Sequence, residues 1–80
     1  MGITYEKETL KLENKIGIEE VEKLLAYLLE TEKLSIDMTK LSHLHTAIFQ
    51  LLLVFQDKIE KIYPPEDKNL QLLIKGGFKL

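Results

Sequence analysis

Hydrophobic and polar residues alternate through residues 3–16 with a period close to two. Ile3 and Tyr5 form one pair of apolar positions, and Leu10 and Leu12 form another. A period of two is typical of a strand with one buried face, so we expect one or two strands here. The charged residues 6–8 would form the turn between two strands, but the pattern leaves the number of strands open.

A helical period follows in residues 18–31. Val21, Leu24, Leu25 and Leu28 recur at the spacing of a single helix face. Three glutamates lie in the first turns of this segment, where carboxylates complement the positive end of the helix dipole. We therefore expect a helix that packs its apolar face on the sheet.

Residues 33–39 return to strict alternation. Leu34, Ile36 and Met38 share one face, and the residues between them are polar. This pattern predicts a half-buried strand with a polar outer face. Residues 40–45 are expected to form a short connection to the next element.

A second helical period covers residues 46–62. Its apolar stripe comprises Ile48, Leu51, Leu52, Phe55, Ile59 and Ile62. Two prolines follow Tyr63, and proline cannot continue a helix, so the helix should end there. Residues 69–75 alternate again and predict a final strand.

The expected order is one or two strands, then helix, strand, helix and strand. Parallel strands joined by right-handed helical crossovers satisfy this order. We therefore predict an α/β fold, with a small mixed β-sheet and helices packed on one face. Eighty residues suffice for one domain and not for two, so residues 1–80 are expected to form a single domain.

Charge and composition argue against several classes of protein. Eleven basic and thirteen acidic side chains give a net charge of −2, whereas nucleic-acid binders carry a clear positive excess. The chain has no cysteine and therefore no disulfide or thiolate site. Its longest apolar run, residues 51–55, is too short to cross a bilayer, and residues 1–7 do not follow a signal-peptide pattern. We expect a cytoplasmic protein that is not inserted in a membrane.

His43 and His45 are the strongest candidates for metal chemistry. In an extended segment both would point the same way, as a zinc site can require. A catalytic zinc site needs three protein ligands, and no further histidine or clustered carboxylate follows at a suitable spacing. The two serines, Ser35 and Ser42, lie outside any nucleophile-elbow pattern. We therefore predict a non-enzymatic protein without a metal or cofactor, in which the histidines serve structure or partner contact.

Thr46 is expected at the start of the second helix. Its hydroxyl would accept a hydrogen bond from an unpaired backbone N–H as the N-cap. The alternative is phosphorylation, since a phosphate at a helix N-terminus meets free N–H donors and a favourable dipole. Position alone favours the cap.

Phe49 and Leu53 interrupt what should be the polar outer face of the second helix. At 100° per residue they fall together with Thr46 on the side opposite the apolar stripe. Paired exposed apolar residues mark an interaction surface, unless a loop or the chain end at residues 78–80 covers them. The pattern does not decide between these alternatives.

Residues 34–55 resemble the STAS domain, named for sulfate transporters and anti-sigma factor antagonists. Leu34-Ser35-Ile36-Asp37-Met38-Thr39 is similar to the strand that ends in Asp-Leu-Ser in that family, and Asp37 matches its aspartate. Thr46-Ala47 stands where the family has its phosphorylatable Ser or Thr and a small residue. Residues 46–53, TAIFQLLL, resemble the Thr-Ala-x-x-Gln-Leu-Leu of short STAS proteins from chemotaxis and sigma-factor operons. His45 replaces the second aspartate of the family, Ile48 replaces a glycine, and the expected last strand leaves no room for the usual C-terminal helix.

The resemblance implies a bacterial regulatory module of the anti-sigma factor antagonist type. Its partner would be a serine-kinase-like anti-sigma factor or a chemotaxis protein, bound through the N-terminal half of the second helix. The contact residues would be His45, Thr46, Phe49, Gln50 and Leu53, and phosphate on Thr46 would weaken the contact.

Two other roles stay open. Some similar short STAS proteins bind an ABC ATPase in phospholipid transport, which makes a transporter accessory subunit the first alternative. The second is a structural homodimer subunit, because a small domain without its last helix would gain stability from a partner.

Overall fold

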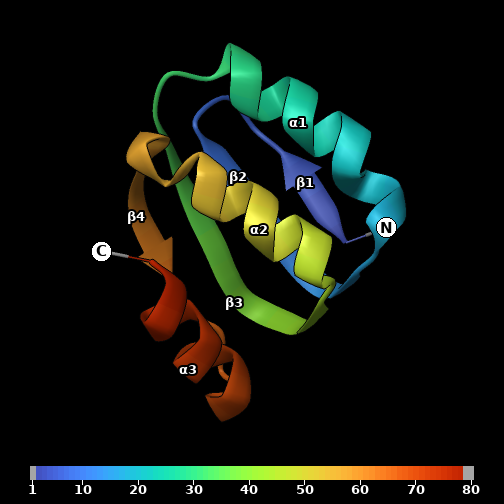
Figure 1. Ribbon diagram of the computed structural model, residues 1–80, viewed down its shortest axis with the longest axis vertical. Helices are drawn as coiled ribbons and strands as arrows, with labels where there is room; N and C mark the ends of the chain where they lie inside the picture. The colour runs from blue at the N-terminus through green and yellow to red at the C-terminus, as the bar shows by residue number, and fades with distance from the viewer. Residues whose placement is uncertain (1, 79–80) are drawn as a thin grey trace.

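The strands of the computed structural model form a single mixed sheet (Figure 1). The structure describes residues 2–78, with the elements β1 (Ile3–Tyr5), β2 (Thr9–Ile16), α1 (Val21–Glu30), β3 (Leu34–Leu44), α2 (Thr46–Val54), β4 (Ile59–Tyr63) and α3 (Lys68–Gly77). The sheet order is β1-β2-β3-β4, in which β1 is antiparallel to β2, and β2, β3 and β4 run parallel. The predicted α/β class with a mixed sheet is confirmed.

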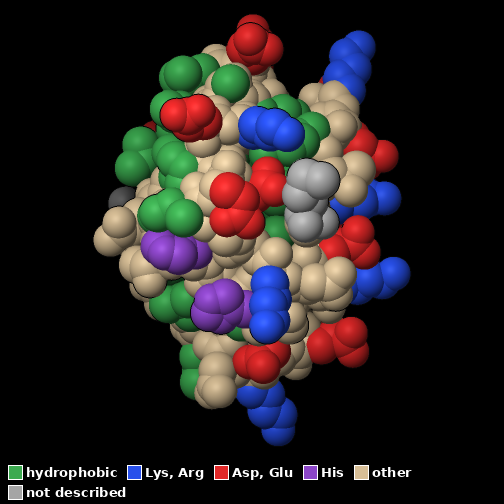
Figure 2. Space-filling model, turned by 90° about the vertical axis from the view of Figure 1, so that its right-hand side faces the viewer, with side chains coloured by type: hydrophobic (Ala, Val, Ile, Leu, Met, Phe, Trp, Pro, Cys, Tyr) green, Lys and Arg blue, Asp and Glu red, His purple; other side chains and the backbone are tan. Residues whose placement is uncertain are grey.

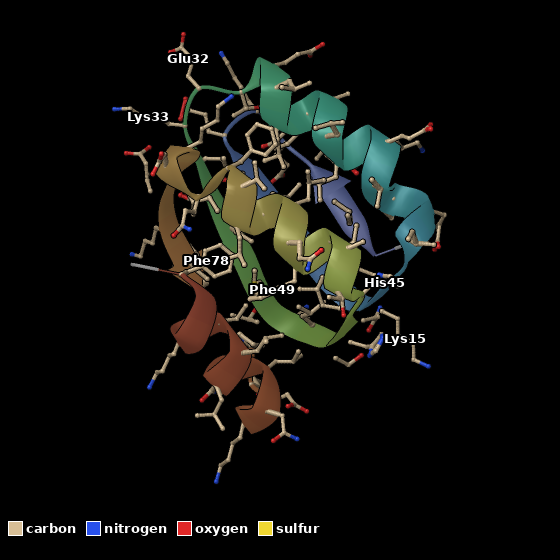
Figure 3. All side chains as sticks on the ribbon, in the orientation of Figure 1. Lys15, Glu32, Lys33, His45, Phe49 and Phe78 are labelled. Atoms are coloured by element: carbon tan, nitrogen blue, oxygen red, sulfur yellow. The ribbon has the colours of Figure 1, made fainter. Side chains whose placement is uncertain are left out.

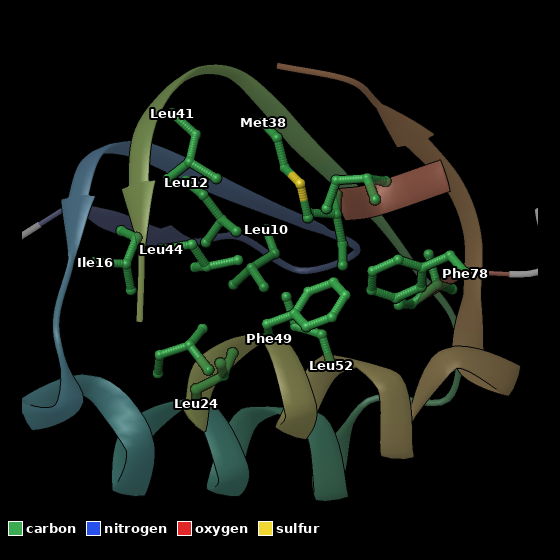
Figure 4. Close-up of a cluster of buried hydrophobic side chains, with 14 of the residues drawn as sticks. Leu10, Leu12, Ile16, Leu24, Met38, Leu41, Leu44, Phe49, Leu52 and Phe78 are labelled. Carbon is green, nitrogen blue, oxygen red and sulfur yellow. The ribbon is translucent and has the colours of Figure 1, made fainter. Parts of the chain in front are cut away.

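Helices α1 and α2 cover one face of the sheet and enclose the core (Figures 1 and 4). The fully buried residues at its centre are Leu10 and Leu12 from β2, Ile36 and Met38 from β3, Leu24 and Leu28 from α1, and Ile48 and Leu52 from α2. The opposite face of the sheet is polar, as the alternation in β3 predicts. Helix α3 lies at the margin, beside β3 and β4 (Figure 1).

The first segment forms two strands, which settles their number. β1 and β2 pair as a hairpin around residues 6–8, and the N–H of Glu6 donates to the carbonyl of Thr9 at 3.0 Å. The hairpin also contacts α1 through Tyr5, whose ring centroid lies 5.3 Å from that of Tyr27. The Tyr5 hydroxyl donates to Oε1 of the buried Glu20 at 3.5 Å. Burial, reinforced by the nearby Glu20 carboxylate, raises the pKa of Tyr5 to about 12.

This raised pKa makes stability depend on pH in the alkaline range. The folded state favours neutral Tyr5, so its contribution is complete below the ordinary pKa of 10.0 and is lost as the pH rises toward 12. We expect the free energy of unfolding to fall over this range, and to fall less steeply in Tyr5→Phe. Burial also raises the pKa of Tyr27, so part of the slope should persist. Denaturant titrations at several alkaline pH values measure the slope, and an identical slope in Tyr5→Phe would contradict the assignment.

β3 is longer than the alternation predicts, and the expected connection at residues 40–45 is largely strand. The pairing of β2 with β3 shifts register between Lys11 and Glu13 and again between Asn14 and Lys15. Asn14 adopts a positive φ of 58°, which suits such an irregularity. The shifts change the spacing of buried residues in β3 from two to three, at Met38, Leu41 and Leu44. This broken period is why the end of β3 does not look like a strand.

The predicted second helix is wrong beyond Val54. A 3-10 turn at Gln56–Lys58 ends the helical path, and Ile59–Tyr63 is the edge strand β4. Because the last helical residues and β4 are both apolar on one side, a helical period runs through the junction without a break.

The predicted final strand at residues 69–75 is also wrong, because this segment is helix α3. Asp67 caps it, with Oδ1 accepting hydrogen bonds from the N–H groups of Asn69 at 2.8 Å and Leu70 at 3.1 Å. The chain therefore has a helix after its last strand, and the expectation that it lacks one is corrected.

The last turn of α3 packs against α2 (Figure 3). The rings of Phe49 and Phe78 meet edge to face, with centroids 5.7 Å apart. Gly77 lies beside the Cζ end of the Phe49 ring, so that a β-carbon there would lie 2.5 Å from Phe49 Cζ. Ile74 and Phe78 are both buried. These contacts anchor the end of α3, while the rest of the helix extends along the margin of the fold.

Candidate functional site

The end of β3 places the start of α2 at the carboxyl edge of the parallel strands. His45 has extended backbone angles, and its Nδ1 accepts a hydrogen bond from the N–H of Ala47 at 3.0 Å. The N–H of His45 also donates to the carbonyl of Ile16 at 3.1 Å, which ties this junction to the end of β2. In parallel α/β sheets the carboxyl ends of the strands are the usual location of binding sites.

His45, and not Thr46, is therefore the N-cap of α2. Thr46 is the first helical residue, and it is exposed. The expectation that its hydroxyl caps the helix is wrong, because the ring nitrogen of His45 already accepts the hydrogen bond of Ala47. The Thr46 side chain is accessible at the edge of the helix layer.

The solvent-facing side of α2 carries no charge. Thr46, Gln50 and Val54 are exposed one turn apart, and Val54 is 74% exposed. None of the nine residues of α2 is acidic or basic. A surface helix normally has charged residues on its outer side, so this uncharged stripe is unusual.

Exposed apolar residues of the neighbouring helix extend this stripe. Leu25 and Leu29 of α1 are 38% and 62% exposed, and Ile18, just before α1, is 58% exposed. Leu25 is thus not the core residue that the helical period predicts. We call Ile18, Leu25, Leu29, Thr46, Gln50 and Val54 together the α1–α2 surface. Figure 2 shows hydrophobic side chains gathered on the helix side of the molecule and charged ones on the sheet side.

Phe49 does not belong to this exposed surface. It is only 9% exposed, because Phe78 covers it, and Leu53 is half-buried near Gly77. Of the two alternatives that the sequence leaves open, cover by the chain end therefore applies to Phe49. The part of that expectation which concerns residues 79–80 lies outside the described residues. Of the five predicted contact residues, His45, Thr46 and Gln50 are exposed.

Asp37 lies on the polar face of the sheet, away from the helices. Its neighbours in β3, Ile36 and Met38, point into the core. Its Oδ1 accepts hydrogen bonds from the N–H and the hydroxyl of Thr39, at 3.0 Å and 2.7 Å, and these hold the pKa of Asp37 below its usual value. The structure therefore does not bring Asp37 together with Thr46.

The two histidines lie near each other at the end of β3 but do not meet other ligands. His43 pairs across the strands with Lys15, while His45 caps α2 (Figures 2 and 3). Within residues 2–78, no three side chains of His, Asp or Glu cluster as metal ligands would. Of the two histidines, His45 thus directly precedes Thr46, as the N-cap of α2.

Comparison with protein-family models, curated proteins and solved structures finds no match for this chain. None of the helices in the described part of the chain combines the length and hydrophobicity needed to cross a bilayer.

Proposed function

We propose that this chain is a non-enzymatic regulatory module that binds a protein partner through the α1–α2 surface. The observation that carries the proposal is the uncharged outer stripe of α2 beside the exposed leucines of α1. Charged residues are depleted at the centre of protein interfaces, where apolar side chains lose water on binding. A contiguous surface of this composition is therefore suited to a protein partner.

The resemblance to short STAS proteins supports a partner of the anti-sigma factor or chemotaxis type. Thr46 stands at the matching position, and it is exposed at one end of the α1–α2 surface. Phosphorylation would place a charge of about −1.5 to −2 there. The first turn of α2 makes this charge tolerable in the free protein, whereas contact with an apolar partner surface would remove water from the phosphate, which is unfavourable. Thr46 thus supplies a switch for the proposed contact.

Charge introduced within the surface tests the proposal. The double variant Gln50→Glu/Val54→Glu alters only exposed side chains of α2, so its fold should be retained. We expect it to bind the partner at least about tenfold more weakly, because a charge at an interface centre must be desolvated. Leu53→Glu is a less suitable probe, since Leu53 is half-buried near Gly77. Leu72→Glu, on the exposed side of α3, is the matched control.

Affinity capture from lysate with mass spectrometry identifies the partner, and calorimetry on the purified pair measures its affinity. A kinase-like anti-sigma factor or chemotaxis protein captured by the wild type and lost with the double variant supports the proposal. An ABC ATPase would instead favour the transporter alternative. Undiminished binding by the double variant, with circular dichroism unchanged, would show that the α1–α2 surface is not the contact. A Thr46→Glu variant that binds as tightly as the wild type would argue against the switch.

A further inference from the structure

We draw no further inference here: the strongest candidate, the exposed apolar side of helix α3 around Leu72 and Leu73, is an unpartnered face, and nothing in residues 2–78 shows what covers it.

Discussion

Replacing Phe49 with alanine is expected to lower the free energy of unfolding by about 3–5 kcal/mol. The ring is only 9% exposed, and it contacts Phe78 edge to face. Truncation removes this aromatic contact and leaves a cavity between α2 and α3, because the backbone of Gly77 cannot fill the space. The STAS resemblance implies that Phe49 is a contact residue, whereas the residue pattern leaves its role open, so this variant separates a core role from a binding role.

Urea denaturation followed by circular dichroism measures the effect. Gln50→Ala is the matched control, since Gln50 is the next residue and is exposed; its effect should stay within about 0.5 kcal/mol. A Phe49→Ala protein with wild-type stability but impaired partner binding would return Phe49 to the binding surface. It would also imply that α3 does not pack on α2 as described.

Gly77→Ala is expected to destabilise the protein by about 1–3 kcal/mol, because it overpacks the same junction. The added β-carbon would lie 2.5 Å from Phe49 Cζ, which is closer than two carbon atoms can pack, and 3.2 Å from Leu53 Cδ2, which is a tight contact. The Phe49 ring cannot turn aside freely, since it packs edge to face with Phe78. The strain would fall on the contact that fixes α3 to α2.

The neighbouring glycine provides the control for this prediction. Gly76→Ala meets no atom within 4 Å of the new β-carbon and replaces glycine within a helix. It should therefore raise the free energy of unfolding by about 0.5–1 kcal/mol. Thermal and urea unfolding of the two variants give the comparison. Equal effects of the two substitutions would contradict the close approach of Gly77 to Phe49.

These variants separate the two sides of α2. Its inner side holds α3 through Phe49, and its outer side forms part of the α1–α2 surface through Gln50 and Val54. Changes on the inner side should alter stability, whereas changes on the outer side should alter only binding.

The elements with a strong local period could be predicted from the sequence. Leu10 and Leu12 in β2, and Leu34, Ile36 and Met38 in β3, alternate with polar residues. Strict alternation of apolar and polar residues fits a half-buried strand and few other structures, so these strands could be predicted.

The boundary after α2 could not be predicted, since Ile59 and Ile62 continue the helical period although they lie in β4. The segment that became α3 was ambiguous for a related reason. Leu70 and Ile74 fit one helix face as well as they fit one face of a strand.

The candidate surface was predicted only in part. His45, Thr46 and Gln50 are exposed as expected, because they begin a helix that covers the sheet. The exposure of Leu25 and Leu29 was not foreseen, since the apolar stripe of α1 is wider than the part that fits against the sheet. A stripe too wide for the core is the signal that would have identified them.

The sequence by itself determined the α/β class, the strands with clear alternation and the position of Thr46 at the start of a helix. Each of these follows from the period of neighbouring residues along the chain. Only the tertiary structure decided that Phe49 is buried and that Leu29 and Val54 are exposed. Periodicity reports which side of an element is apolar, but burial depends on which distant segment covers that side. For Phe49 the covering residue is Phe78, at the far end of the described chain.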